Sequence, residues 1–142
     1  MSQENVEVVE RAIAAVNARD IEAYLACCTQ DIELHTPLAA VKGVYEGPAG
    51  VRQFFADVED AGPDFRLNLE RVRAVGANQV LTFMNVSATG RASRLPTATP
   101  TANVYELANR KIRRLRIFAD RQQALEAVGL QGVGDVAGER PA

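Results

Sequence analysis

The chain has few residues that could hold a metal ion or form a disulfide. It contains one histidine, His35, and two cysteines, Cys27 and Cys28, which are neighbours in the sequence. A metal site needs a cluster of such ligands, and the scattered acids do not supply one. A bridge between adjacent cysteines would be strained. We therefore predict no metal and no other cofactor, and two reduced, buried cysteines in a cytoplasmic protein.

The sequence also lacks a long apolar run and an excess of charge of one sign. No apolar segment approaches the roughly 20 residues that span a bilayer, and the first residues do not resemble a secretion signal. The formal net charge is −2, which gives no overall basic field for nucleic acid or an anionic membrane. Arginines do gather between Arg91 and Arg121, where we expect a solvated face. These absences predict no nucleic-acid partner and no membrane partner.

Apolar residues are abundant enough for one compact domain. They make up 47% of the 142 residues, which suffices to bury a core. We predict a single domain over residues 1–130. Residues 131–142 are rich in glycine and small residues and are predicted to be a disordered tail.

Three helices are predicted in the first half of the chain. Apolar residues recur at three- and four-residue steps over residues 3–18, as on an amphipathic helix. Asp20 can cap a second helix that carries Cys28 and ends before Thr29. A third helix is expected to begin at Gly47-Pro48 and to end at 61–63.

Strands are predicted mainly in the second half. Alternation of apolar and polar residues indicates strands at 32–36, 65–70, 79–89, 101–107 and 112–119. A loop is expected at 93–100, and a short helix at 121–128. The order α-α-β-α-β-β-β-β-α, with helices early and antiparallel strands late, indicates an α+β fold.

Four segments carry a resemblance to a known family. They are residues 8–20, the run Asp-Ile-Glu-Leu-His-Thr-Pro at 31–37, the segment 45–55, and residues 111–130. In this order they resemble the SnoaL-like proteins of the nuclear-transport-factor-2-like superfamily. The resemblance implies a cone-shaped, curved antiparallel sheet wrapped against N-terminal helices, the cystatin-like α+β barrel, with a deep pocket. The superfamily includes ketosteroid isomerases, limonene-epoxide hydrolases, polyketide cyclases and members that only bind ligands or partners.

The resemblance also locates the positions of the ketosteroid isomerase chemistry. The carboxylate base of those enzymes falls on Thr36, the phenol on Ala12 and the carboxylic acid on Asn103. None of the three groups is retained. A threonine cannot act as a base near neutral pH, although Asn103 can still donate a hydrogen bond to a ligand oxygen.

The epoxide hydrolase and cyclase acids are missing as well. By the resemblance, the water-activating aspartate falls on Ile117, and so does the cyclase acid. The remaining epoxide hydrolase residues fall near Met84 and Val86. The resemblance therefore leaves open whether any reaction is catalysed.

Strand parity predicts which side chains face inward, because neighbours in a strand point to opposite faces. Leu34 and Ala119 are expected on the inner face. The predicted ligand pocket is lined by Tyr24, Thr36, Phe54, Met84, Val86, Asn103, Tyr105, Leu115 and Ile117. Such a mostly apolar lining suits a small hydrophobic molecule with one or two oxygens. Alternatively, the same side chains fill a core and leave no space for a ligand.

His35 is the weak candidate for a catalytic residue, since it is the only histidine and can titrate near neutral pH. If Thr36 points inward, His35 points outward, unless a bulge at Pro37 reverses the parity. Arg116 and Asp120 are also expected on the outer face, with Asp120 as a helix cap or an ion-pair partner.

Two functions remain open from the sequence. The first is a pocket that binds a small hydrophobic molecule, with isomerase, cyclase or hydrolase activity undecided. The second is a non-catalytic scaffold or interaction module that forms a homodimer through the outer face of the sheet. Val104, Arg116 and Phe118 are expected to be available on that face by parity.

Overall fold

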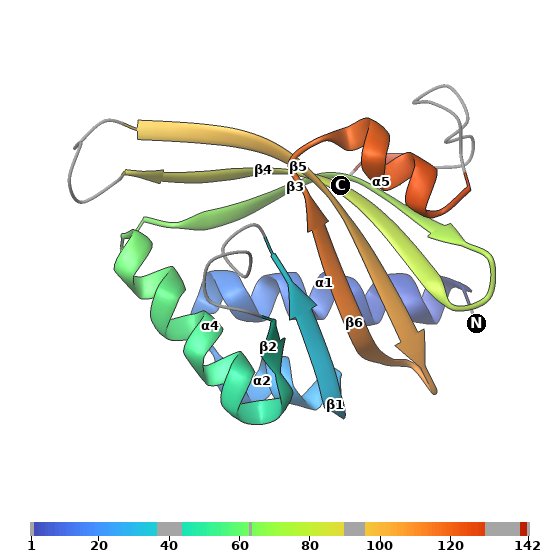
Figure 1. Cartoon of the computed structure of the whole chain (residues 1–142), viewed down its shortest axis with the longest axis horizontal. Helices are drawn as coiled ribbons and strands as arrows, with labels where there is room; N and C mark the ends of the chain where they lie inside the picture. The colour runs from blue at the N-terminus through green and yellow to red at the C-terminus, as the bar shows by residue number, and fades with distance from the viewer. Residues whose placement is uncertain (1, 37–43, 63, 90–95, 130–139, 142) are drawn as a thin grey trace.

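The fold is built on a single curved sheet (Figure 1). The computed structural model describes residues 2–36, 44–62, 64–89, 96–129 and 140–141. Within these ranges the helices are α1 (Ser2–Ala18), α2 (Ile21–Ala26), α4 (Gly47–Ala61) and α5 (Arg121–Ala127). The strands are β1 (Cys28–His35), β2 (Tyr45–Glu46), β3 (Arg66–Val75), β4 (Gln79–Thr89), β5 (Pro96–Ala108), β6 (Lys111–Phe118) and β7 (Arg140–Pro141).

The strand order is β2-β1-β6-β5-β4-β3-β7 across the described part of the chain. Most neighbours are antiparallel, as the predicted fold requires. The exception is β1, which runs parallel to β6. The predicted α+β class is confirmed, with one parallel pair in the sheet.

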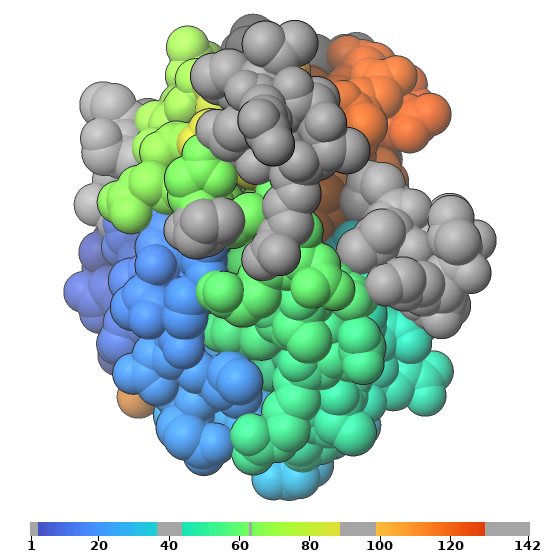
Figure 2. Space-filling view, turned by 90° about the vertical axis from the view of Figure 1, so that its left-hand side faces the viewer, coloured from blue at the N-terminus to red at the C-terminus, as the bar shows by residue number. Residues whose placement is uncertain are grey.

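The two faces of the sheet are covered by different helices. Helices α1, α2 and α4 contribute to the larger core on the concave face. Figure 2 shows α1 and α4 side by side over one side of the molecule, and Arg19, just after α1, pairs with Glu59 of α4 at 2.6 Å. Helix α5 lies on the opposite face, where Ala124 and Leu125 pack in a second, smaller core.

Local signals placed the helix starts correctly. The Asp20 carboxylate accepts a hydrogen bond from the Ala23 N–H at 3.0 Å, and the Asp120 carboxylate accepts one from the Gln122 N–H at 2.9 Å. Both caps satisfy amide donors that a first helical turn leaves unpaired. The predicted capping role of Asp120 is therefore confirmed.

The prediction for Cys28 was wrong. It lies in β1 and not on the second helix, which ends at Ala26. Strand β1 starts four residues earlier than predicted because β6 pairs with Cys28, and the Ile112 N–H donates to the Cys27 carbonyl at 2.8 Å. A register shift between Cys28 and Glu33 hides the alternation in the sequence. Both cysteines are buried and unbridged.

The predicted loop at 93–100 was wrong from Pro96 onward, where β5 begins. Pro96 and Pro100 lack the amide proton that a central strand needs. They are tolerated because β6 pairs with β5 only as far as Ala102, so this part of β5 has β4 as its one described neighbour. Of the predicted tail, residues 131–139 and 142 lie outside the described residues, while 140–141 pair with β3.

A glycine sets the approach of α4 to β2. A Cβ atom at Gly50 would lie 2.7 Å from the backbone carbonyl carbon of Tyr45, a distance that real side chains do not show. The absence of a side chain at Gly50 therefore lets the first turn of α4 rest directly on β2. This contact fixes where the rest of α4 stands over the sheet.

Candidate functional site

A largely apolar cavity of about 290 Å³ lies between the concave face of the sheet and the helices α1, α2 and α4. Among the described residues, its lining comes from α1, α2, α4, the strands β3 to β6, and two residues beside strands, Thr36 after β1 and Phe65 before β3. The lining residues are Ala12, Ile13, Val16, Tyr24, Thr36, Phe54, Asp57, Val58, Ala61, Phe65, Leu67, Met84, Val86, Thr99, Thr101, Asn103, Tyr105, Leu115 and Ile117.

The structure brings the nine residues of the predicted pocket to this one cavity. The register of the strands explains why. Asn103 on β5 stands opposite Ile117 on β6, and Tyr105 stands opposite Leu115. Directly paired residues point to the same face of the sheet. Once the side chains of one strand are assigned to a face, the pairing therefore assigns those of its neighbour.

Two residues expected on the inner face do not line the cavity. Leu34 faces inward but is fully buried in the core. The expectation for Ala119 was wrong, because β6 ends at Phe118 and Ala119 is exposed in the turn that leads to α5.

The polar groups of the cavity lie mainly on β5. Asn103 is 3% exposed, and its amide nitrogen donates to the Thr82 hydroxyl at 3.3 Å. Its carbonyl oxygen Oδ1 has no hydrogen-bond partner among the described residues, and neither has the hydroxyl of Thr101, which is 6% exposed. Unpaired buried polar atoms are uncommon and need an explanation.

Two buried phenols, Tyr24 and Tyr105, also line the cavity and remain neutral. Burial raises the pKa of Tyr24 well above its usual value. Burial also raises the pKa of Tyr105, which a hydrogen bond from Thr82 lowers only in part. Both side chains can therefore donate or accept a hydrogen bond but do not carry charge at physiological pH.

Asp57 on α4 is a cavity residue that sequence reasoning missed. Its buried carboxylate accepts hydrogen bonds from the Tyr45 hydroxyl at 2.5 Å and from the Gln53 amide at 2.9 Å. Burial and the Asp57 carboxylate raise the pKa of Tyr45 to about 12, which keeps the phenol protonated as the donor. The signal was an acid three residues after Phe54 on the inward stripe of the helix.

Thr99 and Thr101 were also missed as lining residues. Both share the parity of Asn103 on β5, so the alternation rule applies to them. Thr99 falls in the segment predicted as a loop, so the alternation rule was not applied to it. Thr101 falls inside the predicted strand, two residues before Asn103, where alternation alone indicates an inward side chain.

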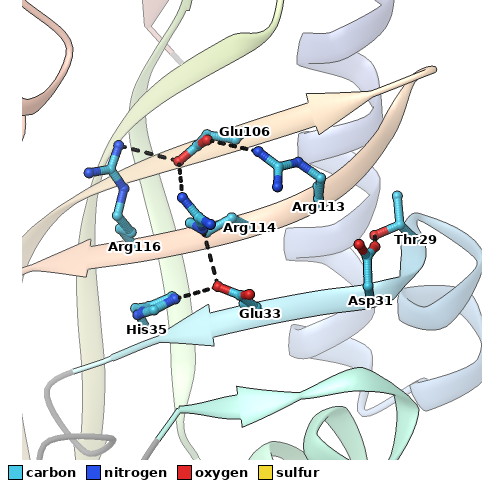
Figure 3. Close-up of polar contacts among 8 residues, drawn as sticks. All are labelled: Thr29, Asp31, Glu33, His35, Glu106, Arg113, Arg114 and Arg116. Atoms are coloured by element: carbon cyan, nitrogen blue, oxygen red, sulfur yellow. Dashed lines mark hydrogen bonds and ion pairs between the residues drawn. The ribbon is translucent and has the colours of Figure 1, made fainter.

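His35 lies on the outer side of the sheet, away from the cavity (Figure 3). Its imidazole contacts the Glu33 carboxylate at 2.9 Å, and Arg114 approaches the same carboxylate at 3.2 Å. The hydrogen bond with His35, followed by the charge of Arg114, lowers the pKa of Glu33. Nothing in this arrangement directs His35 toward the cavity.

The clustered arginines form ion pairs on that outer face. The Glu106 carboxylate on β5 forms ion pairs with Arg113 at 3.4 Å, Arg114 at 3.6 Å and Arg116 at 3.4 Å. These side chains are partly exposed, so each pair contributes little to stability. The outward placement of Arg116 is as predicted.

The expectation that Val104 is available for a partner was wrong. Val104 is fully buried, because α5 covers it with Ala124 and Leu125. Phe118 is partly buried against the same cluster. A strand pattern shows that a residue faces outward but does not show that a distant helix covers it.

A Thr101→Val variant is expected to unfold at a higher temperature than the unmodified protein. Valine has nearly the same shape, and it removes a buried hydroxyl that has no partner among the described residues. Relief of that unpaired group should raise the free energy of unfolding by about 1 kcal/mol. Thermal and urea unfolding measure the change, and a destabilised variant would contradict the assignment.

No helix in the described ranges is long and apolar enough to cross a membrane. No group of three or more histidine, cysteine or acidic residues in the described part of the chain could hold a metal ion.

The sequence model of the SnoaL-like domain family matches residues 9–115, most of the chain, so the protein belongs to the SnoaL-like family. No protein in a search of curated sequences matches. Similar solved structures include proteins described as nuclear-transport-factor-2-like and ketosteroid-isomerase-like. The predicted family and fold are thereby confirmed.

Three similar structures illustrate the match. Bal32a, from a soil-derived mobile gene cassette, is 21% identical, with a TM-score of 0.74 over 82% of this chain and 88% of its own. A cystatin-fold protein of Novosphingobium aromaticivorans is 26% identical, with a TM-score of 0.69 over 83% and 98%. TerC, co-crystallised with polyporic acid, is 23% identical, with a TM-score of 0.71 over 88% and 98%.

Proposed function

We propose that the protein binds one small, largely apolar molecule in the cavity between the sheet and the helices. The observation that carries the proposal is the cavity itself, with its apolar lining and its few polar groups on β5. Pockets of this composition and size are typical of small-molecule sites. An apolar space of this size leaves its lining side chains without contacts on one side, and a ligand that fills it supplies the missing contacts.

Similar structures support this function. TerC was crystallised with polyporic acid, and a ketosteroid-isomerase-like protein of Catenulispora acidiphila was obtained in complex with trimethylamine. Other similar structures are a candidate polyketide cyclase of Xanthomonas campestris and a candidate SnoaL-like polyketide cyclase of Jannaschia. The structures with polyporic acid and with trimethylamine therefore support the proposal that the present cavity binds a small molecule.

The proposal concerns binding and includes no reaction. Ala12, Thr36, Asn103 and Ile117, the positions where the resemblance places the family's acids and phenol, line the cavity without such groups. A homodimer through the outer face and a cytoplasmic location remain predictions. With Val104 covered by α5, we expect such a dimer to use the ion-paired surface of β1 and β6.

An Ala12→Phe variant is expected to bind a two-ring aromatic probe at least about 30-fold more weakly, a loss of roughly 2 kcal/mol of binding free energy. Ala12 is buried on α1 and lines the cavity, so a phenyl ring there occupies the ligand's space. The probe is 2-naphthol, and its own fluorescence reports binding because the chain contains no tryptophan.

The matched control is Ala56→Phe, which adds the same ring to an exposed position of α4 and should leave binding unchanged. If Ala12→Phe does not fold, Val86→Phe tests the same space from β4. Folded cavity variants that bind the probe as tightly as the control would show that the cavity is not the site.

A further inference from the structure

We infer that β5 carries a hydroxyl-recognition subsite, formed by the side chains of Thr101 and Asn103, and that the ligand presents a neutral hydroxyl group to it. The inference rests on the proposed binding function and adds the chemical class of the ligand: a hydrophobic alcohol or phenol.

The two side chains are placed to share one ligand atom. Thr101 and Asn103 are separated by one residue on the same strand and face the same cavity. Their Cα atoms are therefore about 6.8 Å apart along the strand. A ligand oxygen between their polar ends can reach both within hydrogen-bond distance.

One hydrogen bond sets the orientation of the Asn103 amide. Its nitrogen donates to Thr82, the residue directly opposite on β4. This hydrogen bond uses the nitrogen of the amide and leaves Oδ1 without a partner in the described part of the protein.

The chemistry of the unpaired atoms selects the ligand group. The amide oxygen only accepts hydrogen bonds, whereas the threonine hydroxyl donates or accepts. A ligand O–H can donate to Oδ1 of Asn103 while its oxygen accepts from Thr101. A ketone or an ether can accept from Thr101 but leaves Oδ1 buried and unpaired, which weakens binding.

Charge excludes the anionic alternatives. None of the cavity-lining residues that the structure describes is basic, and the one charged residue among them is Asp57. A carboxylate or phosphate would therefore enter an apolar site without a counter-ion, at a high desolvation cost. A neutral hydroxyl can form hydrogen bonds with both unpaired atoms and avoids the cost of desolvating a charge.

The test compares three probes that share one ring system: 2-naphthol, 2-methoxynaphthalene and naphthalene. At neutral pH the unmodified protein should bind 2-naphthol about tenfold more tightly than 2-methoxynaphthalene, because the methoxy group lacks the donor. In Thr101→Val and in Asn103→Leu this preference should fall to about threefold or less, while naphthalene binding changes little.

Thr29→Val is the matched control, since it makes the same substitution on β1, outside the cavity lining, where the Thr29 hydroxyl donates to the Asp31 carboxylate at 2.7 Å in an exposed position. It should keep the full preference for 2-naphthol. Thr101→Val conserves shape, so it tests the subsite even if Asn103→Leu fails to fold. Isothermal titration calorimetry on the 142-residue chain gives all the affinities.

The outcomes separate the two proposals. Equal binding of 2-naphthol and 2-methoxynaphthalene, or a preference that persists in both variants, overturns the hydroxyl subsite and leaves the binding function intact. Tighter binding of 2-methoxynaphthalene also overturns it. If none of the three probes binds, the proposed function fails and the subsite fails with it.

Discussion

A Phe55→Ala variant is expected to lose about 3–5 kcal/mol of the free energy of unfolding. Phe55 on α4 is 3% exposed and belongs to the larger core. Its ring packs edge-on against Tyr24 of α2 at 5.5 Å between centroids and against Phe54 at 6.0 Å. Alanine removes these contacts and leaves a void that Tyr24, anchored on α2, and Phe54, anchored on α4, cannot fill.

Urea unfolding measures this loss, with a lower midpoint and an unchanged dependence on urea concentration. The matched control is Arg52→Ala, one turn earlier on the same helix. Arg52 is exposed, and its ion pair with Glu22 at 3.2 Å lies in solvent, so the loss should stay below about 1 kcal/mol. A loss in Phe55→Ala no larger than in the control would show that α4 is not held by this aromatic cluster.

An Asn17→Ala variant is expected to lose about 2–3 kcal/mol of the free energy of unfolding. The Asn17 amide joins the last turn of α1 to β3 through two hydrogen bonds to one residue. It donates to the Leu67 carbonyl at 2.9 Å and accepts from the Leu67 N–H at 2.8 Å. Alanine leaves both partly buried backbone groups of Leu67 without this partner, and unsatisfied groups of that kind are costly.

The control for Asn17 is Gln3→Ala, which removes an exposed amide from the same helix and should change stability by less than about 0.5 kcal/mol. Because Leu67 lines the cavity, Asn17→Ala should also weaken binding of 2-naphthol. If Asn17→Ala were as mild as Gln3→Ala, water would be replacing both hydrogen bonds, and the amide would not anchor β3.

Much of the fold was predictable because its signals are local. Helix periodicity and the caps at Asp20 and Asp120 depend on residues a few positions apart. The facing of the lining residues could be predicted for the same reason, since alternation along a strand needs only the strand to be assigned. A family resemblance placed the strands in order, and parity then indicated which side chains meet.

The remaining features depend on contacts between distant segments. The early start of β1 comes from pairing with β6, and the extension of β5 through two prolines comes from pairing with β4. The burial of Val104 depends on where α5 packs. Likewise, the unpaired Oδ1 of Asn103 could not be foreseen, because it results from a hydrogen bond to Thr82 across the sheet.

The parallel pairing of β1 with β6 has a consequence for how the chain folds. Before β6 exists, the described neighbour of β1 in the sheet is the two-residue strand β2. The N-terminal helices and β1 therefore cannot complete their layer until the chain has been made as far as Phe118. Such long-range closure slows folding. During synthesis the apolar surface of the first half of the chain therefore stays uncovered until β6 has been made.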